Sequence, residues 1–394
     1  MSVFRPLPLM SSESFARYTI ARRLPSILTD IIAENDFAPG VVSALRALRD
    51  EIAGRQVSPL RENAPDVEEW NLAWREYRGR TWLEMPWYFA ESYFYRRLLE
   101  ATGYFQPGTG EGRDPFEARK ERALNDGDAV SILNKQLQIA QECNDKERFA
   151  HMLQGSLWGN RADLSNIALA ASAAEGLRDS TASNLLIDQT ALVRALFASG
   201  SLLRIDFICD NAGLETLLDL ALADWLLSSG LCRQIVFHLK NRPFFVSDTM
   251  MKDIPPMLAA LREAGGLVAA LAARLDTFRN EGRWILNDDP FWTSWFCFPE
   301  MPAHLRDDLG QSDLVILKGD LNYRRLLDDR HWPPTTRLED ITGYFPASFL
   351  TLRTLKAEII VGLQEGEFEA LIEAEPDWQV NGRRGLVHLI VREK

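Results

Sequence analysis

Acidic and amide side chains directly follow the buried stretch LLRIDFIC at 202–209. Asp210 and Asn211 end it, and Ala212-Gly213 lead into a helical pattern. Such an apolar run is typical of a strand in a parallel sheet, and ligands bind beyond the carboxyl ends of strands in open α/β sheets. A carboxylate and an amide at this place are therefore candidates for a binding site. A plain strand-to-helix turn with a capping residue also explains them.

Two further strand ends carry polar side chains. Asp248 follows a strand predicted at Arg233–Leu239, and Lys318 and Asp320 follow another at Asp313–Leu317. Because parallel strands place their carboxyl ends at one edge, we expect these groups to converge with the first pair. Two aspartates and an amide oxygen suit magnesium, manganese or a similar divalent cation, and not the thiolate and imidazole sites that zinc favours. A lysine beside such a metal suits phosphoryl transfer, which is catalysed by positioning and charge neutralisation.

Several other catalytic motifs are missing. The first strand ends in DNAG and not in the DxDx[TV] loop of haloacid-dehalogenase phosphatases, and GxSxG, HExxH and GxGxxG do not occur. The glycine-rich segment at 106–114 has no preceding strand and no GK[ST] after it, so it does not indicate a phosphate loop. His238 lies within a strand pattern, which favours a structural histidine over a metal ligand.

The elements that position these residues alternate between strands and helices in the second half of the chain. Beyond the three strands, we predict helices at Glu215–Ser229, Ile254–Ala264 and Leu267–Arg279, at least one element within Leu350–Leu363, and a last strand at Leu386–Val391. This alternation is typical of βαβ units. It predicts an α/β fold with a mainly parallel sheet sandwiched by helices in three layers.

The first half has helical periodicity from Ser14 to about Ala198. Pro25 is expected to break or kink the first helix, and Pro39-Gly40 is expected to form a turn. Ser156–Ser165 is expected to interrupt the helical pattern. The predicted helices are Val41–Gln56, Glu117–Asn125, Ala129–Asn144, Lys146–Gly155 and Asn184–Ser199.

We therefore expect a mostly α-helical N-terminal domain at 1–198 and an α/β metal-binding catalytic domain at 199–394. Aromatic residues are densest between Trp70 and Tyr95, which is typical of a packed helical core. The helical half would cap the metal edge and exclude water there. The segments Trp82–Tyr95 and Trp158–Asp163 (above all Trp158, Asn160 and Asp163) are candidates for the wall.

Composition places the protein among ordinary globular proteins. Of 394 residues, 46% are hydrophobic and 25% charged, and a net charge of −12 argues against a nucleic-acid partner. The four cysteines form no pair motif, and the first residues form no signal peptide. No stretch approaches the roughly 20 apolar residues of a membrane span. We expect a cytoplasmic monomer with no membrane partner, with a nuclear location left open.

Segments spread over almost the whole chain resemble one known family, the metal-dependent damage-control phosphatases of subfamily III. The RTxK signature of that subfamily is present as Arg353-Thr354-Leu355-Lys356. The other matching segments are FARYTIARRLPSIL, TWLEMPWYFAESYFYRRLLEATGYF, SLWGNRADLS, FICDNAGLETLLDLALADWLLSSG, FHLKNRPFFVSD, DLVILKGDLNYRRLLDDRHW and LRTLKAEIIVGL.

The resemblance implies roles for individual residues. The family's metal ligands fall on Asp210, Asn211 and Asp248, with cobalt, nickel, manganese or magnesium as the metal. The implied contacts to the substrate phosphate are Asp210, Asn211, Lys318, Asp320, Arg353, Thr354, Leu355, Lys356 and Ala357. A basic contact from a Gly-Lys-x-Gly turn falls on Arg383, and exchanging lysine for arginine alters the geometry of that contact.

Two functions follow from the resemblance. The first is hydrolysis of small sugar phosphates such as fructose 1-phosphate and fructose 6-phosphate, with Asp248 or Asp320 as general base and either water or Asp210 as nucleophile. Lys318, Arg353 and Lys356 would offset the phosphate charge.

The second function is transfer of a methyl group from S-adenosylmethionine to protein glutamate, for which the family position of the cofactor falls on Glu215. The glycine-rich loop usual in such enzymes is absent, and methyl transfer needs no divalent metal, so we favour the phosphatase. A catalytically inactive binding module is a third interpretation, against which the complete set of polar residues argues.

Overall fold

The computed structural model describes residues 6–125, 128–159, 184–198, 200 and 202–392. In this part of the chain one sheet has the strand order β1-β7-β6-β5-β2-β3-β4. All neighbouring strands are parallel except β6 and β7, which confirms the predicted mainly parallel sheet. The strands are β1 (Leu185–Asp188), β2 (Leu202–Ile208), β3 (Cys232–Leu239), β4 (Trp284–Asp288), β5 (Leu314–Lys318), β6 (Phe349–Thr354) and β7 (Gly385–Ile390).

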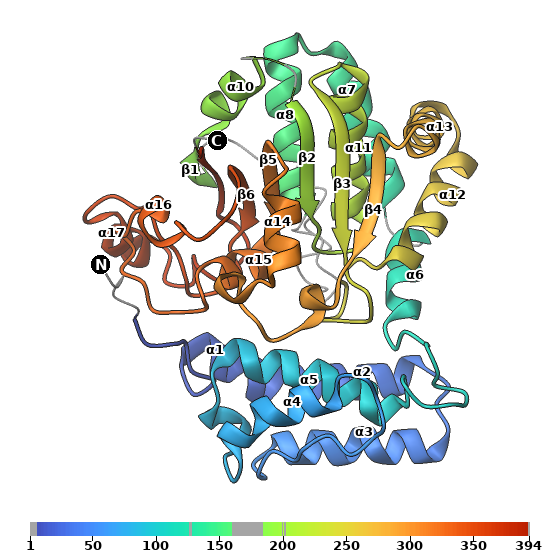
Figure 1. Ribbon diagram of the computed structural model, residues 1–394, viewed down its shortest axis with the longest axis vertical. Coiled ribbons are helices and arrows are strands. Elements are labelled where there is room, and N and C mark those ends of the chain that lie inside the picture. Colours follow the sequence, from blue (N-terminus) through green and yellow to red (C-terminus); the bar gives the residue numbers. More distant parts are fainter. Residues whose placement is uncertain (1–5, 126–127, 160–183, 199, 201, 393–394) are drawn as a thin grey trace.

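Helices cover both faces of this sheet (Figure 1). The helices of one face are α7 (Ala129–Glu142), α8 (Asp145–Trp158), α11 (Leu214–Ser228), α12 (Ile254–Ala264) and α13 (Gly266–Asn280). On the other face lie α14 (Ala303–Leu309) and α15 (Gly319–Leu326). The remaining helices around the sheet are α6 (Glu117–Asn125), α10 (Thr190–Ala198), α16 (Leu338–Ile341) and α17 (Glu367–Ala374).

The hydrophobic core is divided by the sheet into two clusters. Side chains alternate between the faces of a strand, so Ile205 and Phe207 of β2 join one cluster and Ile208 joins the other. On β5 the same alternation separates Ile316 from Leu317. Both faces of these central strands are buried, which explains why their sequences are continuous apolar runs.

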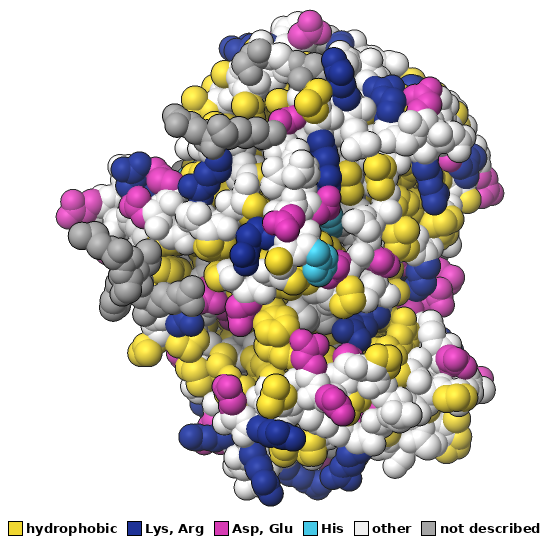
Figure 2. All heavy atoms as spheres, in the orientation of Figure 1, with side chains coloured by type: hydrophobic (Ala, Val, Ile, Leu, Met, Phe, Trp, Pro, Cys, Tyr) yellow, Lys and Arg dark blue, Asp and Glu magenta, His cyan; other side chains and the backbone are white. Residues whose placement is uncertain are grey.

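A separate layer of helices lies across the carboxyl ends of β2, β3 and β4, toward which their arrowheads point (Figure 1). This layer contains α1 (Ser14–Tyr18), α2 (Leu24–Glu34), α3 (Pro39–Ile52), α4 (Val67–Trp74) and α5 (Trp87–Thr102). Its core is aromatic: Phe89 stacks on Tyr93 with 5.7 Å between ring centroids, and Trp70 lies 5.8 Å from Tyr93. Figure 2 shows hydrophobic side chains at the junction of the two layers and both signs of charge over the molecule.

Among the differences from the predictions are two strands and two helix boundaries. Strand β1 replaces the first part of the helix expected at Asn184–Ser199, and β4 was not predicted. Both are short edge strands, and only their distant partners β7 and β3 supply the hydrogen bonds that define them. Helix α3 begins at Pro39, a residue favoured in a first helical turn, and α8 continues through Trp158.

The break expected at Pro25 is instead a change in helical winding. Residues of α1, the π-helix η1 (Thr19–Arg23) and α2 follow one another directly, and the N–H of Leu24 donates to the carbonyl oxygen of Thr19. Pro25 then lies in the first turn of α2. Because π turns inside helices are concentrated at functional sites, the residues of η1 become candidates that the sequence alone did not single out.

The expected division at residue 198 stays a prediction. Helices α7 and α8, on the helical side of that division, pack against α11, and β1 belongs to the sheet. Over the described residues, no helix is long and apolar enough to cross a membrane.

Candidate active site

Backbone hydrogen bonds bring the end of β2 and the loop after β3 together. The N–H of Ala212 donates to the carbonyl of Ser247 at 2.6 Å, and the N–H of Thr249 donates to that of Asp210 at 2.8 Å. Asn211 and Asp248 face each other in a β-bridge between these bonds. The three predicted metal ligands therefore converge through main-chain pairing, as their positions at neighbouring strand ends predicted.

The amide of Asn211 is held in one orientation by its neighbours. Its Nδ2 donates to Asp210 Oδ2 at 3.0 Å and to Glu215 Oε2 at 2.9 Å, while its Oδ1 accepts a 2.6 Å hydrogen bond from Ser247 Oγ. An amide oxygen has two acceptor positions. The Oδ1 atom of Asn211 therefore retains acceptor capacity beside the carboxylate of Asp210.

Two lysines contact Asp248. Lys240 Nζ lies 3.3 Å from Asp248 Oδ2, and Lys120 Nζ donates to the carbonyl oxygen of Asp248 at 2.9 Å. Lys120 also contacts Asp114 and Asp253, at 3.1 and 2.8 Å. The loop that carries Asp248 is thus fixed by a buried ion-pair cluster.

The donor set fits a divalent cation. Asp210, Asn211 and Asp248 are buried from bulk solvent and line one cavity together with Ser247. Buried carboxylates are costly unless a cation accompanies them, and oxygen ligands of this kind suit magnesium or manganese. The residues present would therefore hold a divalent metal.

Asp320 and Lys356 also line the cavity. Asp320 Oδ1 accepts hydrogen bonds from Arg353 Nε at 2.8 Å and from the backbone N–H of Lys356 at 3.0 Å. The fully buried Arg353 also donates to the carbonyls of Ile359 and Ala357, at 2.6 and 3.1 Å. Arg353 therefore folds the loop that presents Lys356 and does not itself line the cavity.

Lys318 is fully buried behind the cavity. Its Nζ donates to the carbonyl and hydroxyl oxygens of Ser156, at 2.6 and 2.9 Å, and lies 3.1 Å from Asp219 Oδ1 and 3.4 Å from Glu215 Oε1. Burial acts to lower the pKa of Lys318, but the charges of Asp219 and Glu215 offset this and raise it. Burial raises the pKa of Asp219 to about 7, against the opposing charge of Lys318.

Glu215 connects this buried cluster with the site. One of its oxygens accepts from Asn211 and the other faces Lys318, so the carboxylate orients a metal ligand. Glu215 does not line the cavity, which disfavours the S-adenosylmethionine contact expected of a methyltransferase.

Besides Lys318 and Arg353, four further predicted substrate contacts lie outside the cavity lining: Thr354, Leu355, Ala357 and Arg383. Thr354 Oγ1 donates to the carbonyl of Leu157 at 3.2 Å, and Leu355 and Ala357 are buried in the core. The side chain of Arg383 is 73% exposed and pairs with Glu375 at 3.0 Å. Trp158 is buried away from the cavity, and Asn160 and Asp163 lie outside the described residues.

The cavity has a further wall that the strand-end argument missed. The helical layer contributes Phe15, Arg23, Trp87 and Glu91, of which Trp87 and Glu91 lie in the predicted wall segment Trp82–Tyr95. The other lining residues are Phe245, Val246, Leu321 and Arg324. Arg23, Glu91 and Arg324 all occur in segments that carry the family resemblance, and this was the available signal.

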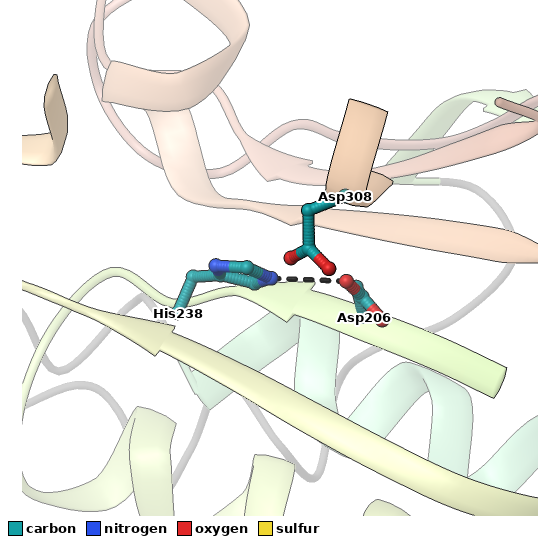
Figure 3. Close-up of side chains that lie close together, drawn as sticks. All are labelled: Asp206, His238 and Asp308. Atoms are coloured by element: carbon teal, nitrogen blue, oxygen red, sulfur yellow. Dashed lines mark hydrogen bonds and ion pairs between the residues drawn. The ribbon is translucent and has the colours of Figure 1, made fainter. Parts of the chain in front are cut away.

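A second acidic cluster lies where Asp308 of α14 meets Asp206 of β2 and His238 of β3 (Figure 3). Ligand atoms of Asp206, His238 and Asp308 lie within 4.8 Å of one another, and His238 Nε2 is 3.0 Å from Asp206 Oδ2. Arg204 donates to both carboxylates at 2.7–3.0 Å. Because the guanidinium already neutralises these acids, the cluster is explained as a buried ion-pair network.

Comparison with known proteins agrees with this arrangement. The family model described as the damage-control phosphatase ARMT1-like domain matches residues 19–371. The chain belongs to this family. Proteins named damage-control phosphatase ARMT1 from Danio rerio and Homo sapiens are 35% and 31% identical to it, covering 95% of this chain and 94% and 95% of theirs.

A solved structure of a DUF89 family protein from Pyrococcus horikoshii has the same fold. Its TM-score is 0.50 at 14% identity, with 96% of this chain and 98% of that chain covered. The predicted fold and the predicted ARMT1-like damage-control family are both confirmed. Membership supports a phosphatase acting on a small phosphorylated metabolite, and together with the oxygen donors of Asp210, Asn211 and Asp248 at the cavity it points to a divalent metal.

Proposed function

We propose that the protein is a metal-dependent phosphatase that hydrolyses small sugar phosphates, among them fructose 1-phosphate and fructose 6-phosphate. The observation that carries this proposal is the convergence of Asp210, Asn211 and Asp248 at one cavity that Lys356 also lines. Oxygen ligands for a cation together with an ammonium group suit the dianion of a phosphate monoester.

Asp210, Asn211 and Asp248 would hold the cation, which is manganese, nickel, cobalt or magnesium. When bound, such an ion neutralises phosphate charge and lowers the pKa of a water ligand. Lys356 binds the phosphate. Lys318 and Arg353 act indirectly: Lys318 orients Asn211 through Glu215, and Arg353 fixes the loop of Lys356.

The proton of the attacking water needs an acceptor. Asp320 offers one, because its Oδ1 is held by Arg353 and Lys356 while the side chain faces the cavity. Asp248 is the second candidate for general base, and a direct attack by Asp210 is the alternative to attack by water.

Assay of the metal-stripped protein against a panel of phosphate esters tests the proposal, with each divalent ion added back in turn. We expect phosphate release that depends on the added ion and is greatest with small sugar phosphates. Equal release without any ion, or no release from any ester with any of the four metals, would show that the proposal is wrong.

A further inference from the structure

The cavity has two chemically distinct ends. The sheet edge supplies the metal ligands and Lys356, whereas the helical layer supplies Phe15, Arg23, Trp87 and Glu91. The proposed reaction needs only the first end. The second end places one carboxylate and one guanidinium on an aromatic wall, and its role is unexplained by phosphate hydrolysis alone.

Glu91 is held rigidly in α5. Its side chain is 3% exposed, and its Oε2 accepts a 2.6 Å hydrogen bond from Arg324 Nη1. Arg324 is itself fixed by two hydrogen bonds to Asp329, at 2.8 and 3.0 Å, and by stacking over Trp87 at 3.6 Å. Among the described residues no donor engages Oε1 of Glu91, so this oxygen is left for a ligand in the cavity.

Arg23 approaches the same place from the π-helix η1. It lines the cavity, and its charge acts with that of Arg324 to lower the pKa of Glu91, although burial dominates and raises that pKa. Arg22, the preceding residue of η1, is exposed and does not line the cavity. In η1, therefore, Arg23 faces the cavity and its neighbour Arg22 faces solvent.

We infer that Glu91 and Arg23 bind the hydroxyl groups of the substrate and so select polyhydroxylated phosphate esters. This inference rests on the proposed function and adds a specificity site to it. Glu91 Oε1 accepts hydrogen bonds from hydroxyl groups, and Arg23 donates to hydroxyl or carbonyl oxygens. The edge-to-face pair of Phe15 and Trp87, with centroids 6.0 Å apart, packs against the carbon chain.

Charge also sets the direction of the substrate. A phosphate at the Glu91 end would meet a buried carboxylate, whereas at the other end it meets Lys356 and the cation held by the three ligands. Specificity of this kind comes from both attraction and repulsion. The substrate is therefore expected to bind with its phosphate at the sheet edge and its hydroxyl groups toward α5.

Kinetics of the metal-loaded Glu91→Gln variant provide the first test. Glutamine keeps an acceptor for Arg324 but presents a neutral amide to the cavity. We expect the ratio of kcat/KM for fructose 1-phosphate to kcat/KM for p-nitrophenyl phosphate, which lacks sugar hydroxyls, to fall about 10-fold, as for loss of a charged hydrogen bond. An equal fall with both substrates, or no change, would overturn the inference.

The two arginines of η1 provide a matched pair of substitutions that keeps the side chains of Glu91, Arg324 and Asp329 in place. Arg23→Gln is expected to lower the same ratio about 5-fold, since a hydrogen bond from a charged donor is lost, while Arg22→Gln leaves it unchanged. If both variants change the ratio to the same extent, the inference that Arg23 binds the substrate hydroxyl groups is wrong.

Calorimetry separates this inference from the proposed function. Metal-loaded protein is titrated with fructose 6-phosphate and with inorganic phosphate, and we expect Glu91→Gln to weaken the first affinity about 10-fold more than the second. This result in a protein without turnover would support the specificity site and contradict the phosphatase. Turnover with an unaltered affinity ratio would support the phosphatase and overturn the specificity site.

Discussion

Two acidic clusters begin four residues apart, at Asp206 of β2 and at Asp210 just after this strand, and they differ in the cation that pairs with them. Asp206 and Asp308 share the guanidinium of Arg204, between β2 and α14. Asp210 and Asp248 instead line a cavity, with Lys240 placed behind Asp248. Carboxylates that share an internal cation form a complete structural unit, whereas carboxylates that face a cavity remain available to a ligand. The presence of acids and a histidine therefore identifies a site less well than the position of the nearest cation.

Replacement of a carboxylate in each cluster is the strongest test of this difference. Asp248→Ala is expected to lower metal-dependent kcat/KM by more than about 10³-fold, because the loss of a ligand removes several kcal/mol of charge stabilisation. Asp308→Asn, in the internal cluster, is the matched control and should change kcat/KM less than about 2-fold. The comparison fails if the two variants lose activity to the same extent.

For stability we expect the opposite order, with the larger loss at the cluster of Asp206. Asp206 is fully buried and pairs with both Arg204 and His238. Asp206→Asn removes this carboxylate from both pairs, and removing one member of a buried ion pair costs about 3 kcal/mol. Urea unfolding should show this loss in the free energy of unfolding. Asp210→Asn, which keeps the shape of its side chain, should lower the free energy of unfolding by less than half as much. Equal losses would mean that both clusters are structural.

Much of the fold and the metal edge follows from local sequence patterns. The buried runs of β2, β3 and β5 and the polar residues after them were recognisable because each lies within a few consecutive positions. The edge strands β1 and β4 were not recognisable, because they are defined by hydrogen bonds to strands that are distant in the sequence. Burial separated true lining residues from buried supports: Lys318 and Arg353 have the charge of phosphate ligands, but both are enclosed by partners that only the folded chain brings together.

The segment Trp82–Tyr95 was predicted as a wall, but the individual residues of the helical wall were not identified, for a related reason. Arg23 and Glu91 belong to helices whose periodicity indicates only which residues pack, and Arg23 follows Arg22 with no difference in residue type. The π-helix η1 determines which of the two lines the cavity. A strand end is a positional signal that sequence reveals, whereas the inner face of a covering helix depends on winding and docking.

His388 extends the comparison to a histidine without a carboxylate bound to it. Burial lowers its pKa to about 4, with the charge of Glu339 opposing this, whereas His238 is paired with Asp206. The unfolded chain therefore binds a proton below pH 6.5 that the folded chain takes up only near pH 4. The free energy of unfolding should fall by about 3 kcal/mol as the pH decreases through that window. Unfolding at pH 7 and pH 4.5 should show a smaller difference for His388→Gln than for the native chain.

The smallest expected effect concerns the hydroxyl group that orients Asn211. Ser247→Ala removes the 2.6 Å hydrogen bond to Asn211 Oδ1 but leaves all three proposed ligands in place. Loss of a group that orients a metal ligand weakens metal binding by about 10-fold, so more manganese should be needed for half-maximal activity, with a nearly unchanged rate at saturation. Ser294→Ala, which removes a buried hydroxyl that does not line the cavity and that donates to the carbonyl of Phe291, is the matched control. If the metal requirement of Ser247→Ala equals that of Ser294→Ala, the amide of Asn211 is not a ligand, and the cavity-facing cluster consists of its two carboxylates alone.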